Sequence, residues 1–168
     1  MRPLIEKVSD LGGCYARPAD EADLVDLIPR LREADRAEVI GYTGGPPELV
    51  MRGSVAGSDI ALALCTPDHT VHGILGAYEI APGVAKVWMV LSDEVFNRKH
   101  SFLKNSPLFV RLLHAYAPLL TNFVDERNTV HIRWLRWLGF VFLRREFLGP
   151  QKLPFLEFVR TPECALPL

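Results

Sequence analysis

The spacing of apolar and polar positions changes several times along the chain, and each pattern predicts a different element. A helical stripe at spacings i, i+3, i+4 and i+7 is formed by Leu24, Leu27, Ile28 and Leu31. Asp20 precedes this stripe as a good N-cap, with acidic Glu21 and Asp23 in the first turn, where the helix dipole favours them. Because Pro29 falls inside the stripe, we expect two short helices or a kink there.

The middle of the chain reads as strands joined by tight turns. A short strand is expected at residues 14–16, the segment "GYTGGPPE" reads as a loop, and apolar runs then cover residues 59–65, 71–80 and 84–92. The last three runs follow one another closely, so an antiparallel meander is the simplest arrangement. Gly73 and Gly76 within the second run indicate a bulge or a close approach of another chain segment.

The last part of the chain returns to helical spacing and then to strands. A helical face is marked by Phe109, Leu112, Leu113 and Tyr116. This helix begins either after Ser106, with Pro107 in its first turn, or near Arg98 with a kink at the proline. A strand "PLLTNFV" follows, then a helix capped by Asn128, and two final strands, "FVFLRREF" and "LPFLEFV", joined by a Gly149-Pro150 turn.

The helix after Asn128 is unusually rich in aromatic side chains. Its apolar positions at i, i+4, i+7 and i+8 are Val130, Trp134, Trp137 and Leu138. Gly139 stands where a helix end favours a left-handed residue. We therefore expect Trp134, Trp137 and Phe140 to be mostly buried.

The order of elements is strand, helices, three strands, helix, strand, helix and two strands. It predicts an α/β (α+β) domain with a mixed, largely antiparallel central sheet, helices on both faces and four helical segments. Residues 1–10 show no clear pattern and are expected to form an N-terminal arm, and residues 11–168 a single domain.

Composition excludes several classes of function. Lys and Arg number 19 and Asp and Glu 20, for a formal net charge of -1, which argues against a dedicated nucleic-acid-binding protein. No apolar run is long enough to span a membrane, and the N-terminus does not look like a signal peptide. Cys14, Cys65 and Cys164 are too far apart for a metal motif or a disulfide framework, so neither a metal site nor a disulfide is expected.

Two segments resemble a known superfamily. Asn128, an amphipathic helix ending in "WLGF" and a following strand resemble the C-terminal half of the GCN5-related N-acetyltransferase (GNAT) fold, and "YARPADEADLVDLIPRL" resembles its first strand and helix. The resemblance implies a GNAT-like sheet and a site for acetyl-CoA. Members of this superfamily hold the cofactor pyrophosphate on backbone amides of a glycine-rich loop that leads into a helix.

The residues that the resemblance assigns to this site are unusual. The corresponding loop reads "DEVFNRKHSF" and contains no glycine, so Arg98, Lys99, His100 and Ser101, with Asn128, are the candidate cofactor-binding residues if acetyl-CoA binds. Asn128 also suits a plain N-cap.

The candidates for acid–base chemistry are also poor. Leu135 lies four residues before Gly139, at the position where the superfamily usually has a tyrosine that acts as the general acid. His131 is the nearest ionisable group on that helix, and carboxylates available as a base are Glu79, Asp93 and Glu94. No catalytic residue is assigned, and a degenerate site without a cofactor is expected.

A narrower and sharper resemblance covers most residues after Cys14. "VWMVLSDEV", "TNFVDERNTVHIRWLRWLGF" and the first helix together resemble the internal virion protein A-like family of short-tailed phages. This resemblance implies a phage virion-associated structural or ejection protein, made in the host cytoplasm and located in the virion, whose partners are other virion proteins or further copies of itself. Two alternatives stay open: an active acetyl-CoA-dependent N-acetyltransferase acting on a host or phage amine, and a host-directed binding effector.

Overall fold

The computed structural model describes residues 8–11 and 14–164, with only the backbone described for residues 8–11, 96 and 98–101. Its strands are β1 (Val8–Leu11), β2 (Cys14–Pro18), β3 (Ile60–Cys65), β4 (Val71–Ala81), β5 (Val84–Leu91), β6 (Leu119–Asp125), β7 (Val141–Leu148) and β8 (Leu153–Arg160). Its α-helices are α1 (Glu21–Leu27), α2 (Glu33–Thr43), α3 (Pro47–Gly57), α4 (Lys99–Tyr116) and α5 (Thr129–Trp137), and two 3₁₀ helices are η1 (Ile28–Arg30) and η2 (Asp93–Arg98). Most of the expected N-terminal arm lies outside the described residues, and β1 begins within it.

The described strands form one sheet in the order β1-β2-β3-β4-β5-β6-β8-β7. All neighbours are antiparallel except β5 and β6, which run parallel. The predicted meander of β3, β4 and β5 and the mixed, largely antiparallel sheet are confirmed. No helix among the described residues is long and apolar enough to cross a membrane.

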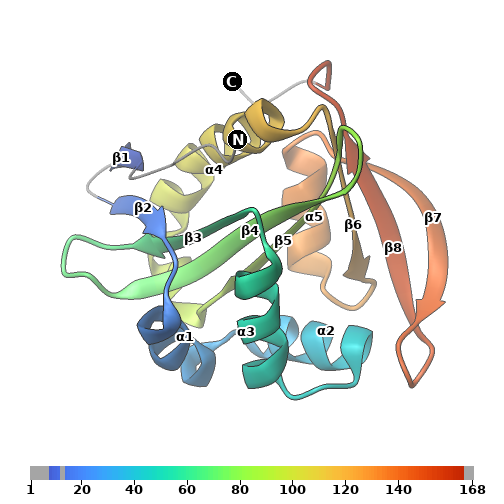
Figure 1. Ribbon diagram of the computed structural model, residues 1–168, viewed down its shortest axis with the longest axis horizontal. Helices are drawn as coiled ribbons and strands as arrows, with labels where there is room; N and C mark the ends of the chain where they lie inside the picture. The colour runs from blue at the N-terminus through green and yellow to red at the C-terminus, as the bar shows by residue number, and fades with distance from the viewer. Residues whose placement is uncertain (1–7, 12–13, 165–168) are drawn as a thin grey trace.

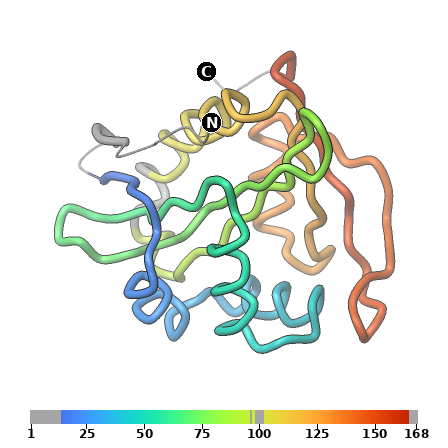
Figure 2. The backbone as a smooth tube through the Cα atoms, viewed as in Figure 1, coloured from blue at the N-terminus to red at the C-terminus, as the bar shows by residue number. Residues whose placement is uncertain are grey.

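Helices cover both faces of the sheet, as predicted. One core joins α4 and α5 to side chains such as Leu62, Leu75 and Val87, and the other joins α1, η1 and α3 to side chains such as Ile74 and Val90. In Figure 1, α4 lies above the strands and α1, α2 and α3 lie below them. Figure 2 shows the same division along the chain, with the blue-to-cyan helical segments on one side and the yellow helix on the other.

The parallel strands β5 and β6 separate soon after they begin. They are paired only from Val84 to Lys86 on β5 and from Leu119 to Thr121 on β6. Beyond Lys86 the strands diverge, and Figure 1 shows their far ends well apart. The sheet is therefore forked at its centre, and the fork positions the candidate site.

The helix that sequence reasoning missed is α3. The segment "GYTGGPPE" was expected to be a loop, but α2 continues to Thr43 and α3 starts at Pro47, so the described residues contain five α-helices instead of four helical segments. The glycine and proline residues of this segment end α2 and begin α3. Gly44 ends α2 in the left-handed region at φ 73, and Pro47 occupies the first turn of α3, where its missing N–H is no loss.

The start of α4 follows one of the two alternatives. The helix begins at Lys99 and carries Pro107 inside it. Ser106 is not its N-cap, because the Ser106 hydroxyl donates a hydrogen bond to the carbonyl oxygen of Phe102 at 2.7 Å.

The buried face of α5 differs from the prediction. Ile132, Leu135 and Leu138 are buried, whereas Trp137 is 43% exposed and Trp134 is half-buried. The prediction for Trp137 was wrong, because the helix turns its aliphatic side chains toward the sheet and this tryptophan away from it. Phe140 is buried and Gly139 adopts φ 84, as predicted.

Candidate functional site

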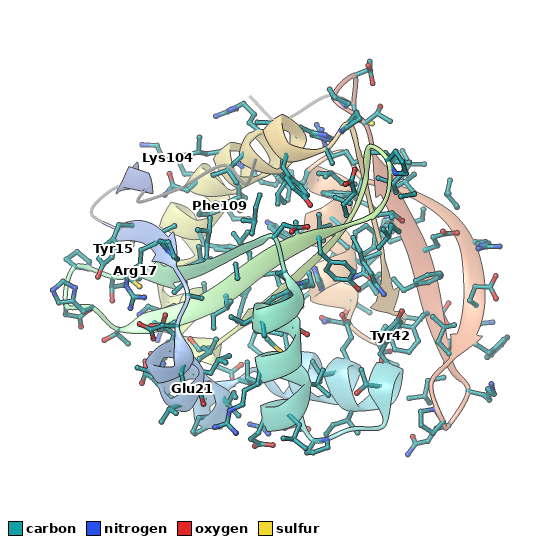
Figure 3. All side chains as sticks on the ribbon, in the orientation of Figure 1. Tyr15, Arg17, Glu21, Tyr42, Lys104 and Phe109 are labelled. Carbon is teal, nitrogen blue, oxygen red and sulfur yellow. The ribbon has the colours of Figure 1, made fainter. Side chains whose placement is uncertain are left out.

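A cavity of about 290 Å³ occupies the fork between β5 and β6 and is called the central cavity below. Its walls come from both faces of the sheet. On one face they include Val110 and Leu113 of α4, Leu135 of α5 and Leu138 directly after it. On the other face they include Glu38, Val39, Tyr42 and Met51 of α2 and α3. Figure 3 labels Phe109 and Tyr42, two of the lining residues, on opposite faces of the sheet. Because the strands diverge, the cavity connects two sides that an ordinary sheet would separate.

A second cavity of about 320 Å³ lies between the start of α4 and the length of α5 and is called the α4–α5 cavity below. Phe102 and Leu103 of the first turns of α4 and the exposed Trp137 of α5 line it. The residues that line both cavities are Asp35, Met89, His131 and Trp134. The two cavities therefore adjoin at these side chains.

The edge of β5 that faces the fork carries backbone groups that no strand pairs with beyond Lys86 in the described part of the chain. The Val87 carbonyl accepts a hydrogen bond from Asn122 Nδ2 at 2.7 Å, and the Leu91 N–H donates to Asp35 Oδ2 at 2.9 Å. Peptide groups alternate in direction along a strand, so those of Met89, between Val87 and Leu91, face the same way. The fork thus presents peptide groups to an extended molecule.

Two carboxylates of α2 lie beside the cavities. Glu38 Oε2 accepts hydrogen bonds from the Asp125 N–H at 3.1 Å and from Asn128 Nδ2 at 3.2 Å. Burial raises the pKa of Glu38 to about 8, and the negative charge of Asp35 contributes to the same shift. Burial also raises the pKa of Asp35, against the opposing charge of Arg32. Glu38 lines the central cavity and suits proton transfer near neutral pH.

His131 stands at the wall shared by the two cavities. Burial lowers the pKa of His131 to about 4, and the charge of Arg32 contributes to the same shift. The imidazole is therefore neutral near pH 7. Its ring lies 5.5 Å from that of Trp134, whose Nε1 donates to Ser106 Oγ at 3.1 Å. His131 can shape the wall and form hydrogen bonds, but as a neutral ring it is not an imidazolium acid.

Lys86 supplies a positive charge at the fork. It is the last residue of β5 that pairs with β6, and its side chain is half-buried in the central cavity. Lys86 Nζ donates to Tyr42 Oη at 2.8 Å and lies 4.8 Å from the centroid of the Tyr42 ring. Tyr42 is fixed in turn by an edge contact with Phe155 at 5.5 Å.

The predicted cofactor-binding residues fall at the start of α4 and of α5. Arg98 ends η2 and Lys99, His100 and Ser101 open α4, so their backbone precedes the turns that line the α4–α5 cavity; their side chains lie outside the described residues. Asn128 is the N-cap of α5, where its side chain accepts from the His131 N–H, and it lines neither cavity. A role for these residues in cofactor binding stays a prediction.

The other expected acid–base positions are not brought together. Leu135 is 3% exposed and lines the central cavity, so no proton donor stands there. Glu79 accepts a hydrogen bond from the Gly83 N–H within an exposed turn, and Glu94 pairs with Arg30 at 3.1 Å. Sequence reasoning missed Glu38, because an acidic residue on an amphipathic helix reads as a solvated side chain.

The described residues do not form a metal-binding site. They contain no group of three or more His, Cys, Asp or Glu side chains that could hold a metal ion. Cys14, Cys65 and Cys164 are free thiols.

Comparison with known proteins places the fold. No protein-family model matches the sequence, and a search among curated proteins finds no match. Among solved structures, a GCN5-related N-acetyltransferase from Kribbella flavida aligns with a TM-score of 0.67 and 19% identity over 90% of this chain and 99% of its own. The ribosomal-protein-S5-alanine acetyltransferase from Vibrio fischeri aligns with a TM-score of 0.66 and 10% identity over 94% and 97%.

A third neighbour contains a bound cofactor. The spermidine N-acetyltransferase from Vibrio cholerae, solved with CoA and spermine, aligns with a TM-score of 0.59 and 14% identity over 89% of this chain and 96% of its own. At these identities the comparisons establish a GNAT-like fold and confirm that prediction.

The comparisons correct the functional expectation. These structural neighbours are acetyltransferases, and none of the findings supports the phage virion family. The prediction of a virion-associated structural protein is therefore wrong.

Proposed function

We propose that the protein is an N-acetyltransferase that uses acetyl-CoA to acetylate an amine. The observation that carries the proposal is the forked sheet, in which the central cavity opens toward both faces between β5 and β6. A reaction between two bound molecules needs the two reacting groups to meet in one place while each is held by its own surface. A cavity that passes through the sheet provides that arrangement.

The fork suits the cofactor on the side of α4 and α5. Acetyl-CoA has a thin arm that contains two amides, and such an arm can hydrogen-bond to an unpaired strand edge as an added strand would. The peptide groups of Met89 face the fork, and Met89 lines both cavities. The start of α4, with Arg98 and Lys99, offers the positive end of a helix dipole to the cofactor's phosphates.

Glu38 is the proposed general base. It lies on the opposite side of the fork from α4, and its pKa of about 8 suits removal of a proton from an ammonium group. The hydrogen bonds from Asp125 and Asn128 both go to Oε2, so they hold the carboxylate in one orientation while the structure shows no bond from the described residues to Oε1. Bound acetyl-CoA supplies a thioester carbonyl that the resulting amine can attack.

The missing general acid lowers the expected rate of acetyl transfer but does not change the proposed reaction. Leu135 provides no acid at the position of the usual tyrosine, and neutral His131 does not replace it. One missing acid–base group typically costs about 10²- to 10⁴-fold in rate. We therefore propose an active enzyme whose turnover is modest.

Calorimetry with acetyl-CoA tests the proposal without any assumption about the acceptor. We expect saturable binding in the micromolar range, competition by CoA, and weakening of about tenfold in an Arg98→Ala, Lys99→Ala double variant because two positive charges at the start of α4 are lost. Arg144→Ala on β7, far along the chain from α4, is the matched control and should bind as the parent protein does. Absence of binding at millimolar acetyl-CoA would refute the proposal.

A further inference from the structure

Building on the proposed function, we infer that the amine acceptor is an apolar α-amino acid, whose carboxylate binds Lys86 while its amine faces Glu38. The neighbours named above include enzymes for a protein and for a polyamine, and neither kind of acceptor explains a lysine in the wall of the central cavity. The inference rests on three features of the acceptor side of the fork.

The first feature is the positive charge of Lys86, which forms no ion pair with a described carboxylate. In the part of the chain that the structure describes, no carboxylate lies within ion-pair distance of Nζ, and the hydrogen bond to Tyr42 Oη uses one of its three N–H donors. The side chain is half-buried and lines the central cavity. A carboxylate in the cavity would accept the remaining hydrogen bonds and neutralise this charge.

The second feature is the placement of the positive and the negative group along one face of α2. Glu38 and Tyr42 lie four residues apart on α2, so their side chains are neighbours on one face of the helix, with Cβ atoms about 5–6 Å apart. The hydroxyl of Tyr42 holds the Lys86 ammonium group beside this face of α2. An α-amino acid carries an ammonium and a carboxylate on one carbon, so it offers one partner of opposite charge to Glu38 and one to Lys86.

The third feature is the apolar wall around these two groups. On this side of the sheet the central cavity is lined mainly by apolar side chains, with Thr43 and Ser54 as polar exceptions; the apolar ones include Val39, Val50, Met51, Tyr78 and Trp88. The Trp88 ring lies against Gly76, where a side chain would collide with it, and Trp88 Nε1 donates to Ser58 Oγ at 2.9 Å. A rigid apolar wall suits an aliphatic or aromatic side chain and does not suit a polyamine, which would leave further ammonium groups without partners.

The step balances in atoms and electrons. One ammonium proton of the amino acid passes to Glu38, and the freed lone pair forms the C–N bond to the acetyl carbon. The C–S bond breaks, and a second proton from the nitrogen ends on the departing sulfur. The products are an N-acetyl amino acid, a free thiol and protonated Glu38, which returns its proton to solvent.

Matched acceptors that differ only in the carboxylate test the inference. L-phenylalanine and phenethylamine share the ring and the amine, and L-leucine and isoamylamine form a second pair. We expect kcat/KM to favour the amino acid of each pair by roughly 10- to 100-fold, the range for a hydrogen bond between two charged groups. Calorimetric titration of L-phenylalanine into the protein saturated with CoA should show binding, and phenethylamine should bind correspondingly less tightly.

Variants of Lys86 and Tyr42 test whether these two residues cause the preference for an acceptor with a carboxylate. Lys86→Met should abolish the preference for the amino acid, and Lys86→Arg should keep most of it because the charge remains. Tyr42→Phe removes the hydroxyl that positions Lys86 and should raise KM for L-phenylalanine with kcat nearly unchanged. Thermal melts check that each variant is folded, and the conservative Lys86→Arg and Tyr42→Phe keep the test valid if Lys86→Met unfolds.

The outcomes separate this inference from the proposed function. If acetyl-CoA binds and amines without a carboxylate are acetylated as well as the amino acids, the inference is overturned and the proposed function stands. If Lys86→Met leaves the preference intact, the assignment of Lys86 is overturned. If acetyl-CoA neither binds nor is consumed, both the proposed function and the inference fail.

Discussion

The pKa of Glu38 is set by several groups that surround its carboxylate. Its carboxylate is removed from water and lies near Asp35 and Asp125, which both disfavour its negative charge, while hydrogen bonds from Asp125 N–H and Asn128 Nδ2 favour it. The balance is a pKa of about 8. A carboxyl group with this pKa gives up and regains its proton close to physiological pH.

Replacing Glu38 by Gln keeps the size of the side chain and removes the base. We expect kcat for amine acetylation to fall by about 10²- to 10⁴-fold, with binding of acetyl-CoA unchanged. Glu94→Gln, in the exposed pair with Arg30, is the matched control and should retain activity. Steady-state kinetics and calorimetry measure the two quantities, and near-normal kcat in Glu38→Gln would contradict the assignment.

The raised pKa of Glu38 also predicts how stability depends on pH. Between the ordinary pKa of 4.5 and about 8 the folded protein holds a proton that the unfolded chain has lost, so the free energy of unfolding falls as pH rises through this window. The neutral amide introduced by Glu38→Gln does not titrate. The melting temperature of Glu38→Gln relative to the parent should therefore increase from pH 5 to pH 9, and a constant difference would show that Glu38 titrates normally in the folded protein.

The orientation of α5 shows how a helix is turned by its surroundings. Ile132, Leu135 and Leu138 pack against the sheet, and Trp134 stacks on Phe102 with ring centroids 5.4 Å apart. Trp137 is half exposed and lines the α4–α5 cavity. The helix therefore buries its aliphatic side and presents an aromatic side to the neighbouring cavity.

Substitutions on the two sides of α5 should differ sharply. Leu138 is 0% exposed, so Leu138→Ala should lower the free energy of unfolding by about 2–5 kcal/mol through the lost apolar contacts and the cavity left behind. Trp137→Ala removes a larger but more exposed side chain and should cost less than Leu138→Ala. Chemical denaturation of both variants measures the free energy of unfolding. A greater loss of stability for Trp137→Ala than for Leu138→Ala would support the sequence-based prediction that Trp137 is buried.

Distant segments meet where the β7–β8 turn touches α2. Gly149 has φ 73, and a Cβ at this position would overlap the carbonyl oxygen of Gly41 on α2. The turn thus seats the β7–β8 hairpin against the helix that carries Glu38 and Tyr42. This contact joins the C-terminal strands to the acceptor side of the site.

The packing of Gly149 predicts a selective effect of alanine. Gly149→Ala should be destabilising, because both the left-handed backbone and the contact with Gly41 exclude a methyl group. Gly53→Ala on α3 is the matched control, since a Cβ there meets nothing within 4 Å, and it should be neutral or stabilising by roughly 0.5–1 kcal/mol. Thermal unfolding of the two variants measures the contrast, and equal melting temperatures would argue against a close fit at Gly149.

Local sequence patterns determined most of the secondary structure. Asp20 and Asp23 form the predicted helix start as a reciprocal capping box, Pro29 divides the first helical stripe, and Gly139 ends α5 in the left-handed region. The meander of β3, β4 and β5 follows from short turns between apolar runs. These features depend on neighbouring residues, whose steric and hydrogen-bonding preferences are the same in any fold.

Only the tertiary structure decided which residues form the site. Glu38, Lys86 and Asn122 come from α2, β5 and β6, and they line one cavity because the parallel strands diverge after Lys86. The pKa of Glu38 depends on burial by segments far away in sequence, and the exposure of Trp137 depends on which side of α5 meets the sheet. Burial, charge coupling and strand divergence are properties of the packed chain, so no local pattern could reveal them.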